Sequence, residues 1–287
     1  MEKSCRRCWP EYFPFRFSGL AVLLPFGKND AMEKFNYQNF VFDYEPYPIA
    51  VNRGFIAPDY YRQLVENFPP IEMFGTFPDG KSHKKALSEL HRPDVYHRFL
   101  RGNPAYLDFY HYIKSPRFIH DVLDCFERNQ ILLHLSGSKI TSSTLPLRGP
   151  LFRKLERLKL RLRRNKGLRG RFEFSALPSD GGSIRPHTDA PVKIITLVIS
   201  ILKEGDWNPA WKGGTDILRP KDIRKSYNFH NNYLDFDECD TLKTIEYVPN
   251  QCILFLKTFN SLHSVAPIQN RGGSVYRRTL TVNIESA

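Results

Sequence analysis

Three residues in the C-terminal half of the chain are of the types that bind a transition-metal ion. His187 and Asp189 form a His-x-Asp motif that follows a glycine-rich turn and enters a β-rich run. Side chains two residues apart on a strand point to the same face, so this imidazole and this carboxylate can bind one ion. His263 opens the run His-Ser-Val-Ala-Pro much further along the chain, and a sheet that folds back on itself can bring it to the same face. We therefore predict that His187, Asp189 and His263 form a catalytic metal site.

The last β-rich run carries an arginine that needs an anionic partner. Period-two alternation places Arg277 and Thr279 on a polar face, and Arg278 on an apolar face that belongs against a hydrophobic layer. The polar face must then line an interior, where a guanidinium requires an anion and a bidentate carboxylate is its natural partner. The Thr279 hydroxyl can donate to the same carboxylate. Alternation thus favours Arg277 over Arg278 as the anion-binding residue.

A His-x-Asp motif, a distant His and an Arg-x-Thr on the terminal strand resemble the iron(II)- and 2-oxoglutarate-dependent dioxygenases. More narrowly, they are similar to the prolyl-hydroxylase-like branch of that superfamily, which has a double-stranded β-helix core. The resemblance implies that His187, Asp189 and His263 bind Fe(II). It also implies that Arg277, with Thr279, binds the distal carboxylate of 2-oxoglutarate, and that O₂ is the other cosubstrate. The implied reaction is hydroxylation of a C–H bond, coupled to conversion of 2-oxoglutarate into succinate.

The donor types favour iron over a structural zinc. Two imidazoles and one carboxylate occupy one face of an octahedron and leave three positions for 2-oxoglutarate and O₂. A structural zinc would close its shell with a fourth protein ligand, often Cys. The carboxylate of Asp189 also argues against the halogenase variant of the family, in which this ligand is missing.

Short β-rich runs separated by turn residues dominate the chain from Arg171 onward. These runs are Arg171–Leu177, Val192–Leu202, Thr244–Val248, Cys252–Thr258, Ser264–Ile268 and Ser274–Ile284. Several strands at this spacing without intervening helices predict an antiparallel sandwich or barrel. The fold class that we expect is therefore α+β. It comprises a double-stranded β-helix (jelly-roll or cupin-like) catalytic core at residues 171–287 and buttressing helices before it, and the resemblance covers about residues 171–285 of that core.

Residues 32–170 are predicted to form the N-terminal strands and helices. Residues 34–55 alternate aromatic and polar positions, which predicts one or two strands. A helix is expected to begin at Ala57-Pro58-Asp59, because proline is favoured in the first helical turn. Residues 84–135 are predicted to be mostly helical, with one helix opening at Ser115-Pro116.

Residues 1–31 are expected to be an extension that is either disordered or the product of a start codon assigned too early. Their apolar run, residues 18–27, is shorter than the roughly 20 residues that a membrane span needs, and Pro25 interrupts it. The five cysteines are scattered, and the CxxC of Cys5 and Cys8 lacks a second pair. Neither a disulfide framework nor a zinc ribbon is therefore predicted, and the cytoplasm is the expected location.

Positive charge is concentrated in one segment. Residues 148–171 carry a net charge of +10 out of +12 for the whole chain. Leu151, Leu155, Leu158 and Leu162 repeat at helical spacing, which predicts a cationic amphipathic helix. Such helices often lie on anionic membranes, which predicts peripheral contact with the inner face of the membrane. Alternatively, the leucines pack on the β-core and the arginines are solvated. Nucleic acid is not an expected partner, because the segment lacks interleaved aromatic residues.

This charge distribution suggests an anionic substrate, such as a glycolipid or a sugar acid. Among family members, the combination is similar to the hydroxylase of 3-deoxy-octulosonate (Kdo), the acidic sugar attached to lipid A in lipopolysaccharide. The alternative enzyme is a peptidyl-prolyl or other protein hydroxylase. The alternative in which the protein is not an enzyme is a non-catalytic cupin-like metal-binding protein. An intact metal triad and an interior arginine both argue against it.

Several nearby residues have two interpretations. Lys193 and Thr196 follow the metal ligands on the same β-rich run and are candidates for a cosubstrate contact. Arg185 either contacts an acidic substrate or stabilises the turn before His187. Trp207 and Trp211 belong to a loop that forms either a substrate lid or an aromatic plug.

Overall fold

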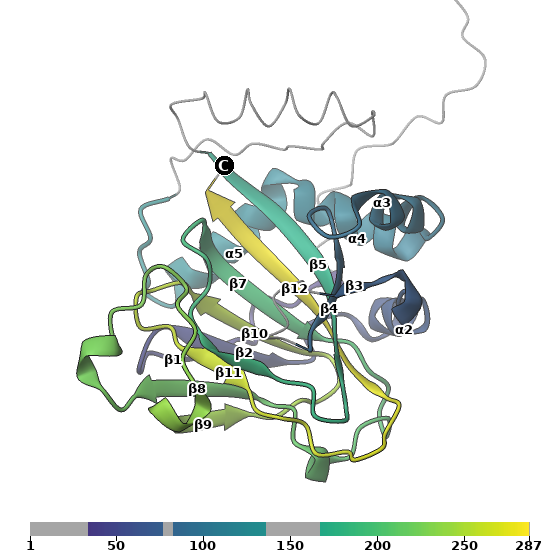
Figure 1. The fold of residues 1–287 in the computed structure, drawn as a ribbon. Helices are drawn as coiled ribbons and strands as arrows, with labels where there is room; N and C mark the ends of the chain where they lie inside the picture. The colour runs from purple at the N-terminus through teal and green to yellow at the C-terminus, as the bar shows by residue number, and fades with distance from the viewer. Residues whose placement is uncertain (1–33, 77–82, 136–166, 287) are drawn as a thin grey trace, which may run out of the picture.

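Two antiparallel sheets face each other in the computed structural model, which describes residues 34–76, 83–135 and 167–286 (Figure 1). The strands of the larger sheet are, in spatial order, β1 (Val41–Asp43), β2 (Ile49–Arg53), β10 (Gln251–Leu256), β7 (Lys193–Ser200), β12 (Tyr276–Ser286), β5 (Leu168–Pro178), β4 (Lys85–Ser88) and β3 (Gly75–Thr76). The strands of the smaller sheet are β6 (Ile184–His187), β11 (His263–Val265), β8 (Thr215–Pro220) and β9 (Cys239–Ile245).

The chain from β5 to β12 winds back and forth between these sheets. Strands β5, β7, β10 and β12 lie together in the larger sheet, whereas β6, β8, β9 and β11 make up the smaller one. Every connection crosses from one sheet to the other, except the β8–β9 pair, which stays in the smaller sheet. This winding defines a double-stranded β-helix, or jelly roll. The predicted α+β fold class is therefore confirmed.

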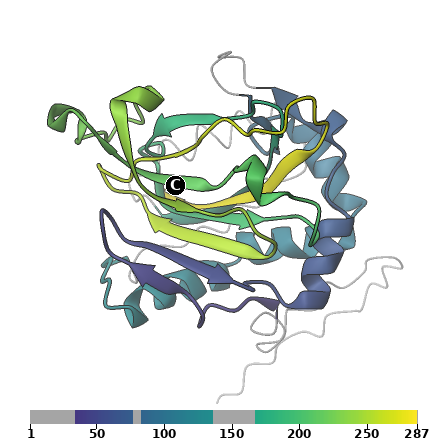
Figure 2. The same cartoon turned by 90° about the horizontal axis from the view of Figure 1, so that it is seen from below.

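Helices cover the outer face of the larger sheet (Figures 1 and 2). Within the described residues the α-helices are α2 (Pro58–Glu66), α3 (Pro93–Arg101), α4 (Pro104–Lys114) and α5 (Pro116–Arg128). Single 3₁₀ turns are formed by Ile71–Met73, Pro209–Trp211, Ile223–Lys225 and Phe236–Glu238. Aromatic rings join the two layers: Phe109 of α4 meets Phe172 of β5 edge to face, with ring centroids 5.0 Å apart. Apolar burial between helices and sheet fixes the larger sheet as one wall of the molecule.

Two helices begin where the sequence predicts. Helix α2 starts at Pro58, with Ala57 as its N-cap. Helix α5 starts at Pro116, and the Ser115 hydroxyl accepts a hydrogen bond from the Phe118 backbone N–H. In both helices proline occupies the first turn, where its missing N–H costs nothing.

The side chains of strand β12 point alternately to the two faces of the larger sheet. Leu280, Val282 and Ile284 are fully buried in the core beneath the helices. Arg277 and Thr279 alternate with them and point to the opposite face, toward the smaller sheet, where they line a cavity. The polar face predicted for this strand is thus the inner wall of the jelly roll.

Several short strands differ from the sequence-based expectation. Residues 84–135 are mostly helical, but Lys85–Ser88 forms β4, which pairs with β5. Strand β9 begins at Cys239, before the predicted run of residues 244–248, and residues 241–244 in its middle are exposed. Short or solvent-facing strands carry too little apolar alternation to be recognised.

The domain boundary predicted at residue 171 stays a prediction. Strands β1–β4, which precede it in the chain, belong to the same hydrogen-bonded sheet as β5, β7, β10 and β12. The predictions for residues 1–31, and most of the basic segment 148–171, fall outside the described residues. Among the residues that are described, no helix has the length and apolar character needed to cross a membrane.

Candidate metal centre

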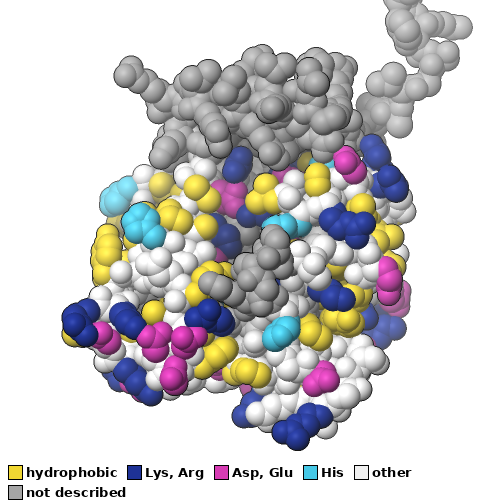
Figure 3. Space-filling view, viewed as in Figure 1, with side chains coloured by type: hydrophobic (Ala, Val, Ile, Leu, Met, Phe, Trp, Pro, Cys, Tyr) yellow, Lys and Arg dark blue, Asp and Glu magenta, His cyan; other side chains and the backbone are white. Residues whose placement is uncertain are grey.

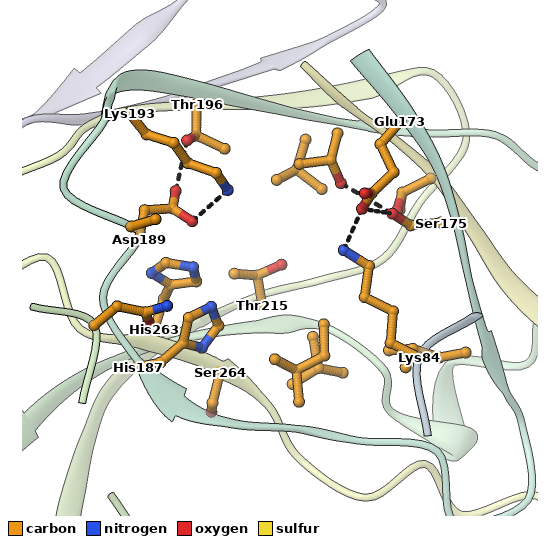
Figure 4. Close-up of a pocket in the computed structure, with 18 of the residues that line it drawn as sticks. Lys84, Glu173, Ser175, His187, Asp189, Lys193, Thr196, Thr215, His263 and Ser264 are labelled. Carbon is orange, nitrogen blue, oxygen red and sulfur yellow. Dashed lines mark hydrogen bonds and ion pairs between the residues drawn. The ribbon is translucent and has the colours of Figure 1, made fainter. Parts of the chain in front are cut away.

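Strand pairing in the smaller sheet brings the three predicted ligands together (Figure 4). His187 ends β6 and His263 begins β11, and these residues are direct partners in the antiparallel register. Their ring centroids are 4.5 Å apart. Asp189 follows β6, and one donor atom from each of the three side chains lies within 4.8 Å of the others. The three side chains can therefore hold one metal ion.

Backbone carbonyls orient both imidazoles. The Nδ1 atom of His187 lies 2.8 Å from the Arg185 carbonyl oxygen, and that of His263 lies 2.9 Å from the Ser261 carbonyl oxygen. A carbonyl oxygen can only accept a hydrogen bond, so Nδ1 must carry the proton in each ring. Each Nε2 is then left with a lone pair for a metal ion, as is usual in proteins.

Burial and neighbouring charges keep the cluster in its metal-binding protonation state. Burial, assisted by the charge of His263, lowers the pKa of His187 to about 3. Burial also lowers the pKa of His263. Burial alone would raise the pKa of Asp189, but Lys193 and the two histidines hold it well below its usual value. At neutral pH the cluster therefore offers two neutral imidazoles and one carboxylate.

Strand β7 supports the Asp189 carboxylate. The Lys193 Nζ atom lies 2.6 Å from Asp189 Oδ1, and the Thr196 hydroxyl donates to Oδ2 at 2.6 Å. The Asn283 side-chain amide, on β12, lies 3.1 Å from the same hydroxyl. The atom of Asn283 that lies there is the acceptor Oδ1, so the single hydroxyl proton goes to the closer and charged carboxylate of Asp189. Lys193 and Thr196 thus both contact the predicted ligand Asp189, and their predicted contact with a cosubstrate stays a prediction.

Arg277 is buried in the same cavity and has no carboxylate partner among the described residues. Its Nε donates to the Gly213 carbonyl at 2.6 Å, and Nη2 donates to the Thr215 hydroxyl at 3.3 Å. Its guanidinium also lies over the Tyr247 ring, 4.9 Å from the centroid. Burial lowers the pKa of Arg277, although Tyr247 and Asp216 act in the opposite direction. A buried guanidinium of this kind is suited to an anionic ligand.

The alternative arginine faces away from the cavity. The Arg278 guanidinium lies over the Phe68 ring on the helix side of the sheet, 5.6 Å from its centroid. Thr279 is buried and lines the cavity together with Arg277. The geometry thus agrees with the alternation argument for Arg277, whereas the roles of Arg277 and Thr279 toward a cosubstrate remain predictions.

The three side chains of the His–Asp–His group lie at one end of a cavity of about 340 Å³ between the two sheets. The wall facing it carries Glu173 and Ser175 of β5, together with Lys84 (Figure 4). Lys84 Nζ lies 2.5 Å from Glu173 Oε1, and the Ser175 hydroxyl donates to the same oxygen at 3.1 Å. Burial alone would raise the pKa of Glu173, but the positive charge of Lys84, with those of Arg171 and Lys193, lowers it to about 2. A substrate in the cavity would lie between the metal ligands and this ion pair.

Sequence reasoning missed part of this cavity wall. Glu173 and Ser175 alternate with Phe172 and Phe174 along β5, so the period-two test applied to the last strand could have found them. Tyr233 stacks on the His187 ring, with centroids 5.3 Å apart, but it comes from a loop that carries no periodic signal.

Arg185, Trp207 and Trp211, for which the sequence left a substrate role and a structural role open, make structural contacts. The Arg185 guanidinium pairs with Asp235 at 2.5 Å, which ties β6 to the loop that precedes β9. Trp207 and Trp211 pack edge to face, and the Trp207 indole donates to the Lys212 carbonyl at 2.8 Å. The two tryptophans join a small apolar cluster and form an aromatic plug.

Comparison with known proteins shows similarity to solved structures only. Searches among protein-family models and curated proteins found no match. A prolyl hydroxylase from Trichoplax adhaerens, in complex with a hypoxia-inducible-factor peptide, is 13% identical with a TM-score of 0.44, and the match covers 83% of each chain. A prolyl-4-hydroxylase from Pseudomonas putida is 14% identical with a TM-score of 0.39, and covers 83% of this chain and 92% of the other.

The non-heme α-ketoglutarate-dependent epimerase SnoN from nogalamycin biosynthesis is also similar. It is 10% identical with a TM-score of 0.43, and the match covers 83% of this chain and 76% of the epimerase. Similarities at this level carry no information on function. Strand topology and side-chain geometry themselves define the class of protein, a double-stranded β-helix with a candidate His–Asp–His metal centre.

Proposed function

We propose that this protein is an Fe(II)- and 2-oxoglutarate-dependent oxygenase that hydroxylates an anionic substrate. One observation carries the proposal: a His–Asp–His cluster and a buried arginine without a carboxylate partner line the same cavity. A metal ion with open coordination positions and an anion-binding cation together suit an anionic cosubstrate that chelates the metal.

The donor set supports iron. In the described residues the cluster contains three ligands, and no fourth His, Cys, Asp or Glu joins them. Three facial ligands leave open positions on an octahedral Fe(II), whereas a structural zinc prefers four protein ligands. Both imidazoles present Nε2, and the single carboxylate is ionised.

The surroundings of Arg277 support 2-oxoglutarate. This cosubstrate has a keto-acid end that can chelate a metal and a second carboxylate at its far end. The buried guanidinium keeps N–H groups that can bind the far carboxylate, and the hydroxyl of Thr279 lines the same part of the strand. We therefore assign Arg277 and Thr279 as the 2-oxoglutarate-binding residues.

When bound, iron with 2-oxoglutarate and O₂ would supply the oxidising power, and succinate, CO₂ and a hydroxylated substrate would be the products. The chain's own contribution is positioning. His187, Asp189 and His263 hold three positions and leave the others open toward the cavity. Thr196 keeps the Asp189 carboxylate in one orientation. The cavity lies between the two sheets, whose side chains form its walls.

The charge of the cavity supports an anionic substrate. Four cationic side chains (Lys84, Arg171, Lys193, Arg277) and two anionic ones (Glu173, Asp189) lie among the described residues of its wall. The Arg171 guanidinium is already paired with Glu285 behind the wall. Because Fe(II) and the 2-oxoglutarate dianion would add equal and opposite charges, an excess of one positive charge would remain. On the face of the molecule that Figure 3 shows, by contrast, cationic and anionic side chains are interspersed.

We infer that the substrate is a sugar acid or an anionic glycolipid, for which the Kdo sugar of lipid A is the specific candidate. Peripheral membrane contact through residues 148–171 belongs to the same proposal, and nearly all of that segment lies outside the described residues. Cosedimentation with anionic vesicles, compared with neutral vesicles, tests this part separately. A protein that stays in the supernatant with both and does not convert Kdo-lipid A would contradict it.

Turnover of 2-oxoglutarate tests the reaction class. The purified protein, supplied with Fe(II) and O₂, should form succinate from 2-oxoglutarate slowly on its own and faster with its substrate. Stimulation by proline peptides instead of Kdo-lipid A would favour a protein hydroxylase. Bound iron without turnover in any substrate pool would favour a non-catalytic metal-binding protein. Untargeted mass spectrometry of cells with and without the gene would identify a product that has gained one oxygen atom.

A further inference from the structure

Both oxygens of the Asp189 carboxylate are engaged by groups of the chain itself. Thr196 donates to Oδ2, and the Lys193 ammonium lies 2.6 Å from Oδ1 (Figure 4). Lys193 stands four residues after Asp189, at the start of β7, and their side chains are 18% and 6% exposed. This pair is therefore a largely desolvated contact between an ammonium group and a predicted metal ligand.

A lysine in this position has a different effect from the threonine. A metal ion held by His187, Asp189 and His263 would bind the same carboxylate that Lys193 contacts. Two cations would then share one negative charge at short range, where solvent screens them poorly. The neutral Thr196 hydroxyl can stay on one oxygen while a metal ion binds the other. Of these two contacts, that of Lys193 opposes the ion electrostatically.

We propose that Lys193 is an internal competitor of the metal ion at Asp189. It weakens the binding of divalent ions by the centre and stabilises the chain when no ion is bound, because a buried carboxylate without a partner is costly. The inference rests on the metal centre of the proposed function, but not on the reaction. A consequence is that metal binding frees the ammonium within the cavity that it lines, where it can pair with an anionic ligand.

A second lysine provides a matched control. Lys257 Nζ lies close to the motif and hydrogen-bonds the Thr188 hydroxyl at 3.0 Å and the Asn228 carbonyl at 3.3 Å. It is not among the ion-pair partners of Asp189. Replacing Lys257 by Met removes the same charge from the same neighbourhood and leaves the contact between Lys193 and Asp189 intact.

The test compares Lys193→Met, Lys257→Met and the wild type in binding Co(II), a probe that requires no turnover. Lys193→Met should lower the dissociation constant of Co(II) about tenfold. It should also lower the melting temperature of the metal-free protein by roughly 5 °C. The rise in melting temperature on adding Co(II) should then be larger than in the wild type, because tighter binding stabilises more. Lys257→Met should change the dissociation constant by less than about threefold.

An unchanged or increased dissociation constant in Lys193→Met would overturn the inference. An equal gain in affinity in Lys257→Met would also overturn it, because the effect would then belong to the general field and not to the contact. If Lys193→Met fails to fold, Lys193→Gln, which keeps a hydrogen-bond donor without the charge, undergoes the same comparison. A wild-type chain that binds no Co(II) would refute the metal centre itself, whereas absence of succinate formation alone would leave this inference intact.

Discussion

At the scale of single residues, the chemistry of the centre depends on what the other atoms of each ligand contact. The imidazoles of His187 and His263 donate through Nδ1 to carbonyl oxygens two residues earlier in the chain. The Asp189 carboxylate accepts a hydrogen bond from the Thr196 hydroxyl of β7, which leaves its other oxygen for an ion once Lys193 is displaced. Each ligand therefore has a fixed orientation before an ion binds, which lowers the entropic cost of binding.

The two adjacent arginines of β12 should differ sharply in function. Arg277→Leu should raise the KM for 2-oxoglutarate at least about tenfold, because the variant loses a charge-assisted contact with the distal carboxylate. Arg278→Leu should stay within about twofold of the wild type, since its guanidinium lies over Phe68 on the helix side. Steady-state kinetics with varied 2-oxoglutarate measures both values. An increase in Arg278→Leu alone would place the anion site on the other face of the strand.

Glu173 should make the stability of the fold depend on acidic pH. Its pKa in the folded chain, about 2, lies below the ordinary value of 4.5 for a glutamate. The unfolded chain therefore binds the proton more readily, and the ion pair with Lys84 contributes its full stability only above about pH 4.5. That contribution is lost as the pH falls through 4.5 toward 2.

The melting temperature measured across this pH range checks the Glu173 prediction. Glu173→Gln should be less stable than the wild type at neutral pH, because Lys84 loses its partner. The melting temperature of the variant should also fall less steeply than that of the wild type between pH 4.5 and 2. Parallel curves for the two proteins would show that Glu173 does not hold a lowered pKa in the fold.

At the scale of elements, strand β12 separates the apolar layer from the cavity, and neighbouring residues should respond differently to truncation. Leu280→Ala should destabilise the protein by about 3 kcal/mol, because Leu280 is fully buried under the helices. Thr281→Ala should cost less than about 1 kcal/mol, since Thr281 lines the cavity and is only partly buried. Urea denaturation measures both values. Equal losses would mean that the two residues do not lie on opposite faces.

The sequence allowed the elements with strong periodicity to be predicted, and the others only in part. Strand β12 has eleven residues with alternating polar and apolar side chains, so both its identity and its inner face could be read from the sequence. Proline in the first turn marked the starts of α2 and α5. Strand β4 has four residues, and β8 enters the sheet directly after a glycine turn. Such short segments obtain their structure from pairing with neighbours, which a single sequence does not reveal.

At the scale of the whole molecule, sheet closure creates the cavity from distant segments. The sequence indicated His187, Asp189 and His263 by residue type, but only the pairing of β6 with β11 makes the two histidines direct neighbours. Lys84 reaches the cavity from the N-terminal part, and Tyr233 reaches it from the loop before β9. Neither could be assigned to the wall beforehand, because these contacts depend on how loops cross the open ends of the jelly roll.

Anaerobic equilibrium dialysis with Fe(II) and labelled 2-oxoglutarate tests the metal and cosubstrate assignment most directly. The wild type should retain one Fe(II) per chain, and 2-oxoglutarate should bind in equal amount only when the iron is present. Asp189→Ala should lose both ligands, whereas Arg277→Leu should keep the iron and lose most of the 2-oxoglutarate. Substoichiometric iron in the wild type, or binding of 2-oxoglutarate that neither iron nor Arg277 influences, would contradict the assignment of His187, Asp189 and His263 as the iron centre of an oxygenase.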